Sequence, residues 1–137
     1  MTADLCVRDL MGRDVKTLNH NDKLTIADEL MRMDRIRHLP VIDEGEELVG
    51  IVSQRDLFRS ALARTLGYGE RAQQKLMEQL LVKEVMSKPV ETISPDAPIA
   101  EAARLMSEKK IGCLVVSEVE RIVGILTEGD FVRHLAS

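Results

Sequence analysis

Short aliphatic runs in this chain alternate with longer stretches whose apolar residues recur every three or four positions. Four runs predict strands: LPVID (39–43), LVGIVS (48–53), CLVVS (113–117) and IVGILT (122–127). They are nearly continuous in hydrophobicity, which is typical of a sheet whose faces are covered. The turns EGEE and EVER join them in pairs, and shorter extended segments are predicted at 15–18 and 90–93.

Helices are predicted where the apolar spacing changes to three and four residues. One apolar stripe contains Leu24, Ala27, Leu30 and Met31, and a second contains Ile99, Ala102, Leu105 and Met106. The preceding polar residues, Asn21-Asp22 and Ser94 to Asp96, are expected to cap these helices. A further helix closes each half. The first closing helix carries Leu57, Phe58, Ala61 and Leu62, and the second is short and ends near Leu135.

The chain is an internal repeat. Val7 to Met11 (VRDLM) recurs 75 positions later as Val82 to Met86 (VKEVM), and the same shift pairs Thr17 with Thr92 and Ile36 with Ile111. One residue drops out near Glu46, so that GIVSQRD (50–56) recurs as GILTEGD (124–130). We therefore divide the chain into repeat 1 (1–63), an inter-repeat segment (64–81) and repeat 2 (82–137).

The inter-repeat segment is predicted to be structured. Gly67-Tyr68-Gly69 is expected to break the first closing helix, after which residues 70–86 show helical apolar spacing. This stretch is too apolar and too periodic for a flexible linker. We expect it to pack on the rest of the chain or on a partner.

Composition narrows the function. The 137 residues include 2% aromatic residues, so any flat ligand would meet aliphatic walls and backbone. A net charge of −4 argues against a general nucleic-acid binder, which needs a basic face. The two cysteines show no metal-site spacing, no stretch is long and apolar enough for a membrane helix, and the N-terminus does not read as a signal peptide. We expect a cytoplasmic protein with no nucleic-acid or membrane partner and no metal site.

The order of these elements, found twice, resembles the CBS (cystathionine-β-synthase) domain family. The resemblance rests on VRDLM and VKEVM, on RIRHLPVID leading into a strand, and on the closing pattern of Gly, two aliphatics, Ser or Thr, two variable residues and Asp. It implies an α/β (α+β) fold of two tandem β-α-β-β-α repeats packed pseudo-symmetrically into one module. It also implies adenosyl ligands in clefts between the repeats, commonly in a homodimer.

The resemblance also implies which residues contact the ligand. Each repeat contributes strand-end hydroxyl and aspartate residues, a loop that reads adenine through its backbone, and residues that line the cleft. These are Thr17, Ile36, Arg37, His38, Ser53, Arg55 and Asp56 in repeat 1, and Thr92, Ile93, Ile111, Gly112, Cys113, Thr127 and Asp130 in repeat 2.

The residues support this role chemically, and they also have a simpler explanation. A carboxylate accepts hydrogen bonds from the two hydroxyls of a ribose, and a helix start favours phosphate. An aspartate three residues after a strand-end hydroxyl is nevertheless often only a helix cap. Repeat 1 carries Arg35, Arg37 and Arg55 near its expected cleft, whereas repeat 2 carries Glu128. We therefore expect the cleft with Asp56 to bind more tightly or to prefer more phosphates.

The favoured function is a regulatory module that senses AMP, ADP, ATP or S-adenosylmethionine and signals by conformational change to an unidentified protein partner. The alternative is a structural dimerisation module whose clefts bind nothing. Catalysis is not expected, because no nucleophile and base are paired by any motif, and 67–72, which matches G-x-G-x-x-A, follows a helix instead of a strand.

Overall fold

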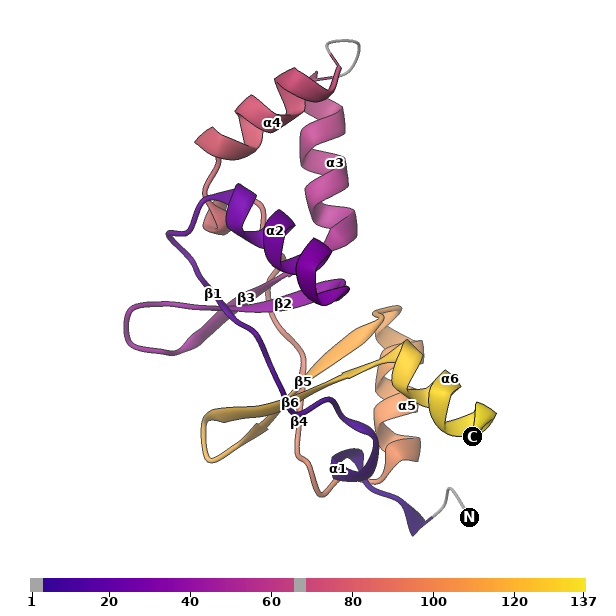
Figure 1. Cartoon of the computed structure of the whole chain (residues 1–137). Coiled ribbons are helices and arrows are strands. Elements are labelled where there is room, and N and C mark those ends of the chain that lie inside the picture. Colours follow the sequence, from indigo (N-terminus) through magenta and orange to yellow (C-terminus); the bar gives the residue numbers. More distant parts are fainter. Residues whose placement is uncertain (1–3, 66–68) are drawn as a thin grey trace. The chain divides into compact units, whose positions relative to one another are not determined.

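The structure is a computed structural model, and it describes residues 4–65 and 69–137, without the side chains of residues 60–65. The chain forms two compact units (Figure 1). One unit is continuous and runs from Lys16 to Val90. The other combines Met1–Val15 with Glu91–Ser137. We refer to them as the 16–90 unit and the 91–137 unit.

The 16–90 unit contains a three-stranded sheet with helices packed on it. The sheet has the order β1 (Leu18–Asn19), β2 (His38–Ile42), β3 (Leu48–Ser53), with β1 parallel and β3 antiparallel to β2. Its helices are α2 (Leu24–Asp34), α3 (Gln54–Thr65) and α4 (Glu70–Gln79), followed by the 3₁₀ turn η2 (Val82–Glu84). Residues 66–68, on which the predicted helix break falls, lie outside the described residues, as do the side chains of Ala61 and Leu62.

The 91–137 unit repeats this arrangement. Its sheet has the order β4 (Thr92–Ile93), β5 (Cys113–Glu118), β6 (Arg121–Thr127), again with one parallel and one antiparallel pair. Its helices are α1 (Val7–Leu10), α5 (Ile99–Lys109) and α6 (Glu128–Ala136). The predicted mixed α and β fold with two matching repeats is confirmed. Of the described helices, none is long and apolar enough to cross a membrane.

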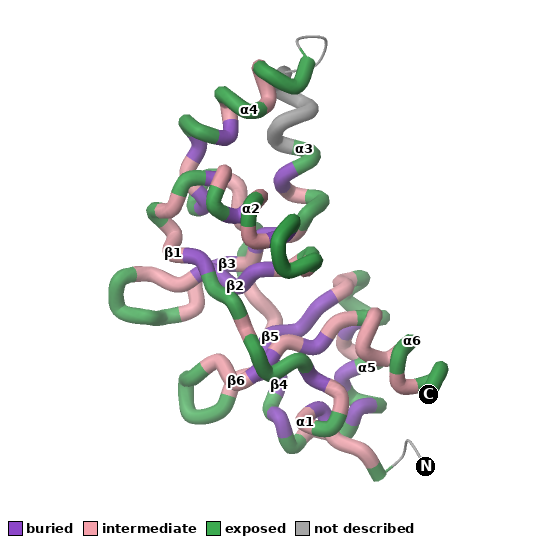
Figure 2. The backbone as a smooth tube through the Cα atoms, viewed as in Figure 1, coloured by how far each residue is buried: buried purple, intermediate pink, exposed green. Residues whose placement is uncertain are grey.

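The predicted apolar stripes form the two cores. Leu24, Ala27 and Met31 of α2 are buried with Leu39, Val41 and Val52 of the sheet. The matching residues Ala102 and Met106 of α5 are buried with Leu114, Val116 and Leu126. The buried positions follow the middle strands β2 and β5 (Figure 2), which explains the aliphatic runs in the sequence.

Two predictions about helix ends are wrong. Neither Asn21-Asp22 nor Ser94–Asp96 caps a helix: Asp22 accepts the Asn19 amide, and Ser94 accepts the Asp96 amide. The apolar stretch after residue 70 is also helical only as far as Gln79, because Leu80 is extended and its carbonyl accepts the Leu24 amide at 2.8 Å. The first amide of α2 is therefore satisfied by a backbone carbonyl that is distant in the sequence, and not by a local side chain.

The segment that precedes each repeat in sequence packs in the unit formed by the other repeat. Residues 5–12 pair with 97–99 and with β6, where Gly12 and Ile125 exchange two backbone hydrogen bonds of 2.9 and 3.0 Å. Residues 80–87 pair in the same way with 22–24 and with β3, through Ile51 and Ser87. Each repeat is therefore completed by a segment that the sequence assigns to its neighbour.

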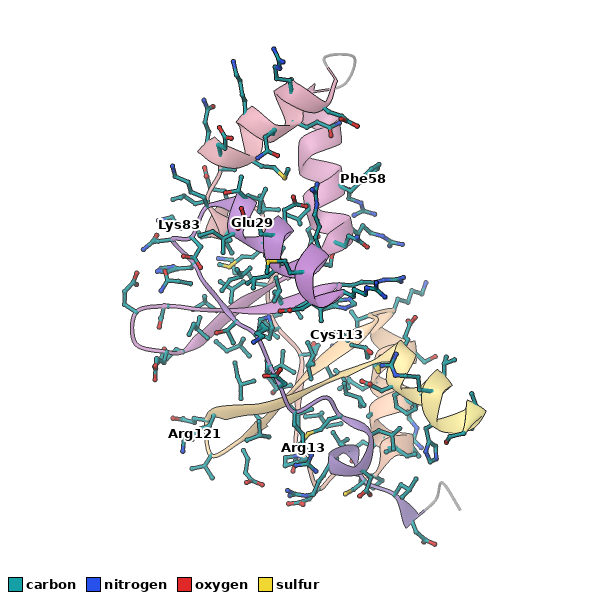
Figure 3. The ribbon with its side chains drawn as sticks, in the orientation of Figure 1. Arg13, Glu29, Phe58, Lys83, Cys113 and Arg121 are labelled. Carbon is teal, nitrogen blue, oxygen red and sulfur yellow. The ribbon has the colours of Figure 1, made fainter. Side chains whose placement is uncertain are left out.

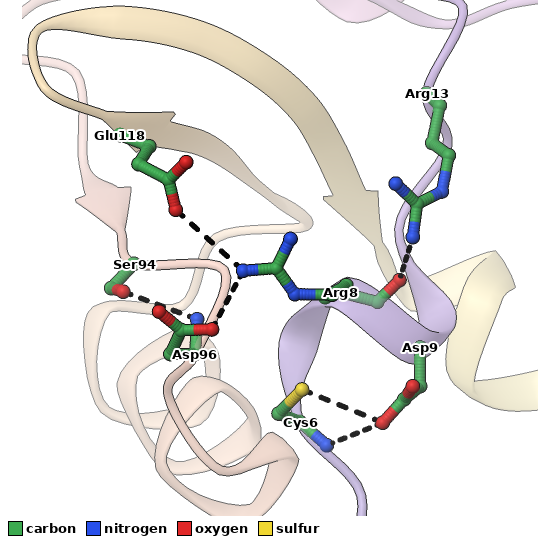
Figure 4. A network of polar contacts seen from close by, with 7 residues as sticks. All are labelled: Cys6, Arg8, Asp9, Arg13, Ser94, Asp96 and Glu118. Atoms are coloured by element: carbon green, nitrogen blue, oxygen red, sulfur yellow. Dashed lines mark hydrogen bonds and ion pairs between the residues drawn. The ribbon is translucent and has the colours of Figure 1, made fainter.

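An exposed ion network fastens the first of these segments (Figure 4). Arg8 donates to Asp96 at 2.6 Å and lies 3.6 Å from Glu118, while Arg13 donates to the Arg8 carbonyl. The hydrogen bond from Arg8 to Asp96 raises the pKa of the guanidinium. Asp9 accepts the backbone amide of Cys6 at 2.9 Å, and this hydrogen bond lowers the pKa of the Asp9 carboxyl. Residue 83, the counterpart of Arg8, is a lysine with no ion pair among the described residues.

The glycine in each last strand makes room for a methionine of the exchanged segment. A Cβ on Gly50 would lie 2.8 Å from Cγ of Met86 and also against its sulfur. A Cβ on Gly124 would lie 2.9 Å from Cγ of Met11 and 2.9 Å from the Gly12 carbonyl oxygen. Only the second position is therefore limited by backbone as well as by a flexible side chain.

We expect Gly50→Ala and Gly124→Ala to destabilise the protein by about 1–3 kcal/mol, because both overpack a filled site. Gly124→Ala should cost more, since the Gly12 backbone cannot move without breaking its pairing with Ile125. Denaturant unfolding of the two variants, each with and without Met86→Ala or Met11→Ala, measures this. Equal costs, or a full rescue of Gly124→Ala by Met11→Ala, would contradict it.

Candidate functional site

In the 16–90 unit, several predicted site residues gather at one end of the β2–β3 pair, which we call the first edge. His38 begins β2 and lies opposite Ser53, which ends β3. α3 starts at the next residue, and the amide of Gln54 donates to the Arg37 carbonyl at 2.8 Å. The loop from α2 to β2, the end of β3 and the start of α3 are thereby held together.

Asp56 closes this edge through a reciprocal cap. Its Oδ2 accepts the Ser53 amide at 2.8 Å, and its own amide donates to the Ser53 hydroxyl at 3.1 Å. Ser53 and Asp56 thus form a capping box at the start of α3. This agrees with the simpler explanation of the aspartate, as a residue that caps a helix. Oδ1 of Asp56 has no hydrogen-bond partner among the described residues, so the cap occupies only one carboxylate oxygen.

The 91–137 unit has a matching arrangement at the end of the β5–β6 pair, which we call the second edge. Cys113 begins β5 opposite Thr127, and the amide of Glu128 donates to the Gly112 carbonyl at 3.1 Å. Oδ2 of Asp130 accepts the Thr127 amide at 2.8 Å and its hydroxyl at 3.2 Å. Here the second oxygen is also used, because Arg133 donates to Oδ1 at 2.7 Å.

The remaining predicted residues flank these edges. Thr17 precedes β1 and is exposed. Thr92 is exposed in β4, where it pairs with Val115 of β5, two residues after Cys113. Ile36 and Ile111 follow the left-handed residues Arg35 (φ 54°) and Lys110 (φ 56°), which end α2 and α5. Ile93 follows Thr92 in β4, and its side chain belongs to the core of its unit.

Charge divides the two edges. Arg35, Arg37, Arg55 and Arg59 are all exposed around the first edge, and none forms an ion pair with another described residue. At the second edge, Lys109 pairs with Glu91 at 3.5 Å and Arg133 pairs with Asp130. The arginines of the first edge therefore pair with no other described residue, whereas at the second edge Lys109 and Arg133 are paired and Lys110 is not.

Cys113 lies buried at the start of β5 (Figure 3). Burial, with a smaller contribution from the nearby Asp130 carboxylate, raises the pKa of the thiol to about 12. The thiol is therefore protonated at neutral pH and acts as a small hydrophobic side chain. In the described parts of the chain, no three His, Cys, Asp or Glu side chains come together as a metal site.

Two surface hollows lie within single units. One of about 240 Å³ lies between α5 and α6, and Ile111, Glu128 and Phe131 contribute to its lining. The other, about 600 Å³, lies between α2 and α4 and is lined by Arg32, Glu70 and Met77 among others. Only the hollow of about 240 Å³ adjoins residues of a predicted site.

The contact between Arg133 and Asp130 was not predicted from the sequence. Its signal was present, because the repeats pair Arg133 with Arg59 and pair Gly129 with Arg55. Residue 129 is a glycine where repeat 1 has Arg55, and this is the sequence difference that accompanies the contact.

Comparison with known proteins supports the repeat. The CBS domain family model matches residues 7–63 and 82–137. The crystal structure of a putative acetoin utilization protein (AcuB) from Vibrio cholerae is 36% identical, with a TM-score of 0.78 over 96% of this chain and 90% of that chain.

Two further structures contain adenosyl ligands. CBSX2 in complex with AMP is 30% identical, with a TM-score of 0.74 over 96% of both chains. The CBS domain pair of protein MJ0100, in complex with 5′-methylthioadenosine and S-adenosyl-L-methionine, is 27% identical, with a TM-score of 0.77 over 96% of both chains. This chain spans only 22% to 32% of the length of the first curated relatives it matches, several of which have enzyme names.

We expect one cysteine of the native protein to react rapidly with a thiol reagent at pH 8. With a pKa of about 12, about one Cys113 thiol in 10⁴ is ionised at that pH, and only the thiolate reacts. Cys6 is less buried, so Cys6→Ser should remove the rapid phase and Cys113→Ser should leave it. Rapid reaction of both thiols without denaturant would show that Cys113 is accessible and ionisable.

Proposed function

Since the chain belongs to the CBS domain family, as a tandem pair, we propose that it is a regulatory module that binds an adenosine nucleotide or a related adenosyl ligand. Binding at the two edges then shifts the conformation of the module, and an unidentified protein partner responds. The role requires that the ligand bind one conformation more tightly than another. It is a regulatory role and not a catalytic one.

The observation that carries this proposal is the pair of hydroxyl–aspartate edges at matching positions in the two units. Each presents a carboxylate, a strand-end hydroxyl and the start of a helix within a few residues. These are the groups that a ribose and a phosphate require. The AMP-bound and S-adenosylmethionine-bound relatives support the adenosyl class of ligand.

The proposed contacts follow the sequence prediction. Asp56 and Asp130 hold ribose hydroxyls, and Ser53 and Thr127 face phosphate. The loops at 36–38 and 111–113 read adenine through their backbone, while Thr17, Thr92 and Ile93 border the ligand. Arg37, Arg55 and His38 lie at the phosphate side of the first edge.

The two edges are proposed to differ in preference. Four exposed arginines without ion pairs to described residues favour a di- or triphosphate at the first edge, because guanidinium binds phosphate oxygens in pairs. At the second edge Glu128 and the paired Lys109 favour a ligand with less negative charge. S-adenosylmethionine and AMP are candidates there.

We expect Asp56→Ala to lower ATP affinity by about tenfold or more, because hydrogen bonds to a charged acceptor are lost. Asp130→Ala should lower it much less. Calorimetric titration of AMP, ATP and S-adenosylmethionine, with GMP as the control ligand, measures this. Asp56→Asn is the matched variant, because its amide oxygen can still accept the Ser53 amide and preserve the cap.

Equal losses in the two alanine variants would refute the difference between the edges and leave the adenosyl ligand in place. No binding of any adenosyl ligand to the wild-type protein would refute the proposed sensor. The repeats would then favour the alternative function, a dimerisation scaffold.

We also propose a homodimer. Phe58 of α3 and Val132 of α6 occupy the same position in the two repeats, and both are exposed, by 65% and 64% (Figure 3 labels Phe58). Met33 and Leu135 are exposed as well, at 80% and 76%. Large apolar side chains at matching positions favour burial against a second chain.

Light scattering at micromolar concentration should give about twice the chain mass of 15.4 kDa. Val132→Asp should shift the mass toward one chain, because a charge would be buried in the contact. Val119→Asp, at an exposed turn, is the control and should remain a dimer. A wild-type particle of 15.4 kDa would rule out the dimer.

A further inference from the structure

Arg133 occupies the carboxylate oxygen that a ribose would need at the second edge. Oδ2 of Asp130 already accepts two donors from Thr127, and Arg133 donates to Oδ1 at 2.7 Å. The Asp130 side chain is only 13% exposed, whereas Arg133 is 72% exposed. The guanidinium thus closes the carboxylate from the solvent side.

The first edge has the same two residue types without this contact. Asp56 and Arg59 are the counterparts of Asp130 and Arg133, yet they form no ion pair among the described residues. The spacing along the helix is three residues in both repeats, so spacing alone does not explain the difference.

Gly129 explains why Arg133 can fold back. The Arg133 guanidinium lies over this glycine, where a Cβ would be 3.1 Å from Nη1 and 3.4 Å from Nη2. The counterpart of Gly129 is Arg55, which has a long side chain of the same charge as Arg59. Bulk and like-charge repulsion therefore disfavour the contact at the first edge.

We propose that Arg133 is a specificity-determining residue that competes with ligand for Asp130, and that Gly129 permits it. The inference rests on the proposed adenosyl binding at these edges. A ligand enters the second edge only by displacing the guanidinium from Oδ1. The first edge, which lacks the competitor, fills first.

The size of the effect follows from the exposure of the ion pair. Exposed ion pairs contribute little, so releasing Arg133 should strengthen ligand binding by about two- to fivefold. Adenosine is the best probe because it has a ribose and no charge. Removing a positive charge from the protein then has no direct electrostatic effect on the ligand.

The test is calorimetric titration of adenosine into the full chain carrying Asp56→Ala, with and without Arg133→Met. Methionine retains an apolar stem and cannot pair with Asp130. We expect the affinity for adenosine to rise two- to fivefold with Arg133→Met. Arg121→Met is the matched control, since it removes the same charge from an exposed position at the far end of β6 and should change nothing.

The reciprocal change should install the competitor at the first edge. In a chain carrying Asp130→Ala, Arg55→Gly should lower adenosine affinity by a similar factor, because Arg59 can then reach Asp56. Arg55→Ala removes the charge but keeps a Cβ, so it should have a smaller effect than Arg55→Gly.

The outcomes separate the two claims. If the wild-type protein binds adenosine or AMP but Arg133→Met leaves adenosine affinity unchanged, the competitor is refuted and the proposed function stands. A lower affinity in Arg133→Met would make Arg133 a ligand contact and also refute it. If no variant binds any adenosyl ligand, both the competitor and the proposed function are wrong.

Discussion

The backbone pairing between each last strand and the segment that precedes the other repeat is the constraint on which both units depend. Gly12 exchanges two hydrogen bonds with Ile125, and Ser87 exchanges two with Ile51. The same segments satisfy the first amides of α2 and α5, which have no capping side chain of their own. They also place Met11 and Met86 over the strand glycines. In each unit, one short stretch of chain thus pairs with the outer strand of the sheet, satisfies the first amide of a helix and fills part of the core.

The candidate site depends on this closure. β3 and β6 are each held along one side by the exchanged segment, and their last residues, Ser53 and Thr127, begin the capping boxes. A capping aspartate is fixed in position before any ligand arrives, which lowers the entropic cost of binding. Helix capping and ribose binding are therefore compatible roles for one carboxylate, provided that one oxygen stays available. That condition holds for Asp56 among the described residues, and Arg133 removes it for Asp130.

The shared pattern of the two repeats conceals a difference in charge between the two edges. Equivalent positions carry Arg37 and Gly112, Arg55 and Gly129, and Gln54 and Glu128. Repeat 1 therefore has guanidinium groups at its edge that pair with no other described residue, whereas repeat 2 has one paired guanidinium, on Arg133, and one paired ammonium, on Lys109. Under the proposed function, the two edges would respond to ligands of different charge, and a single module would then have two inputs.

Sequence patterns were enough to predict the repeat, the strands, the apolar faces of α2 and α5, and the pairing of hydroxyl with aspartate, because these depend on local periodicity and short spacing. The folded chain was needed to show what caps α2 and α5, where α4 ends, and that residues 5–12 and 80–87 complete the opposite repeat. Those contacts join residues far apart in the chain, and a backbone amide or carbonyl leaves no residue-specific mark in the sequence. The contact between Arg133 and Asp130 is intermediate. Its residues are three apart, but whether they meet depends on the space over Gly129.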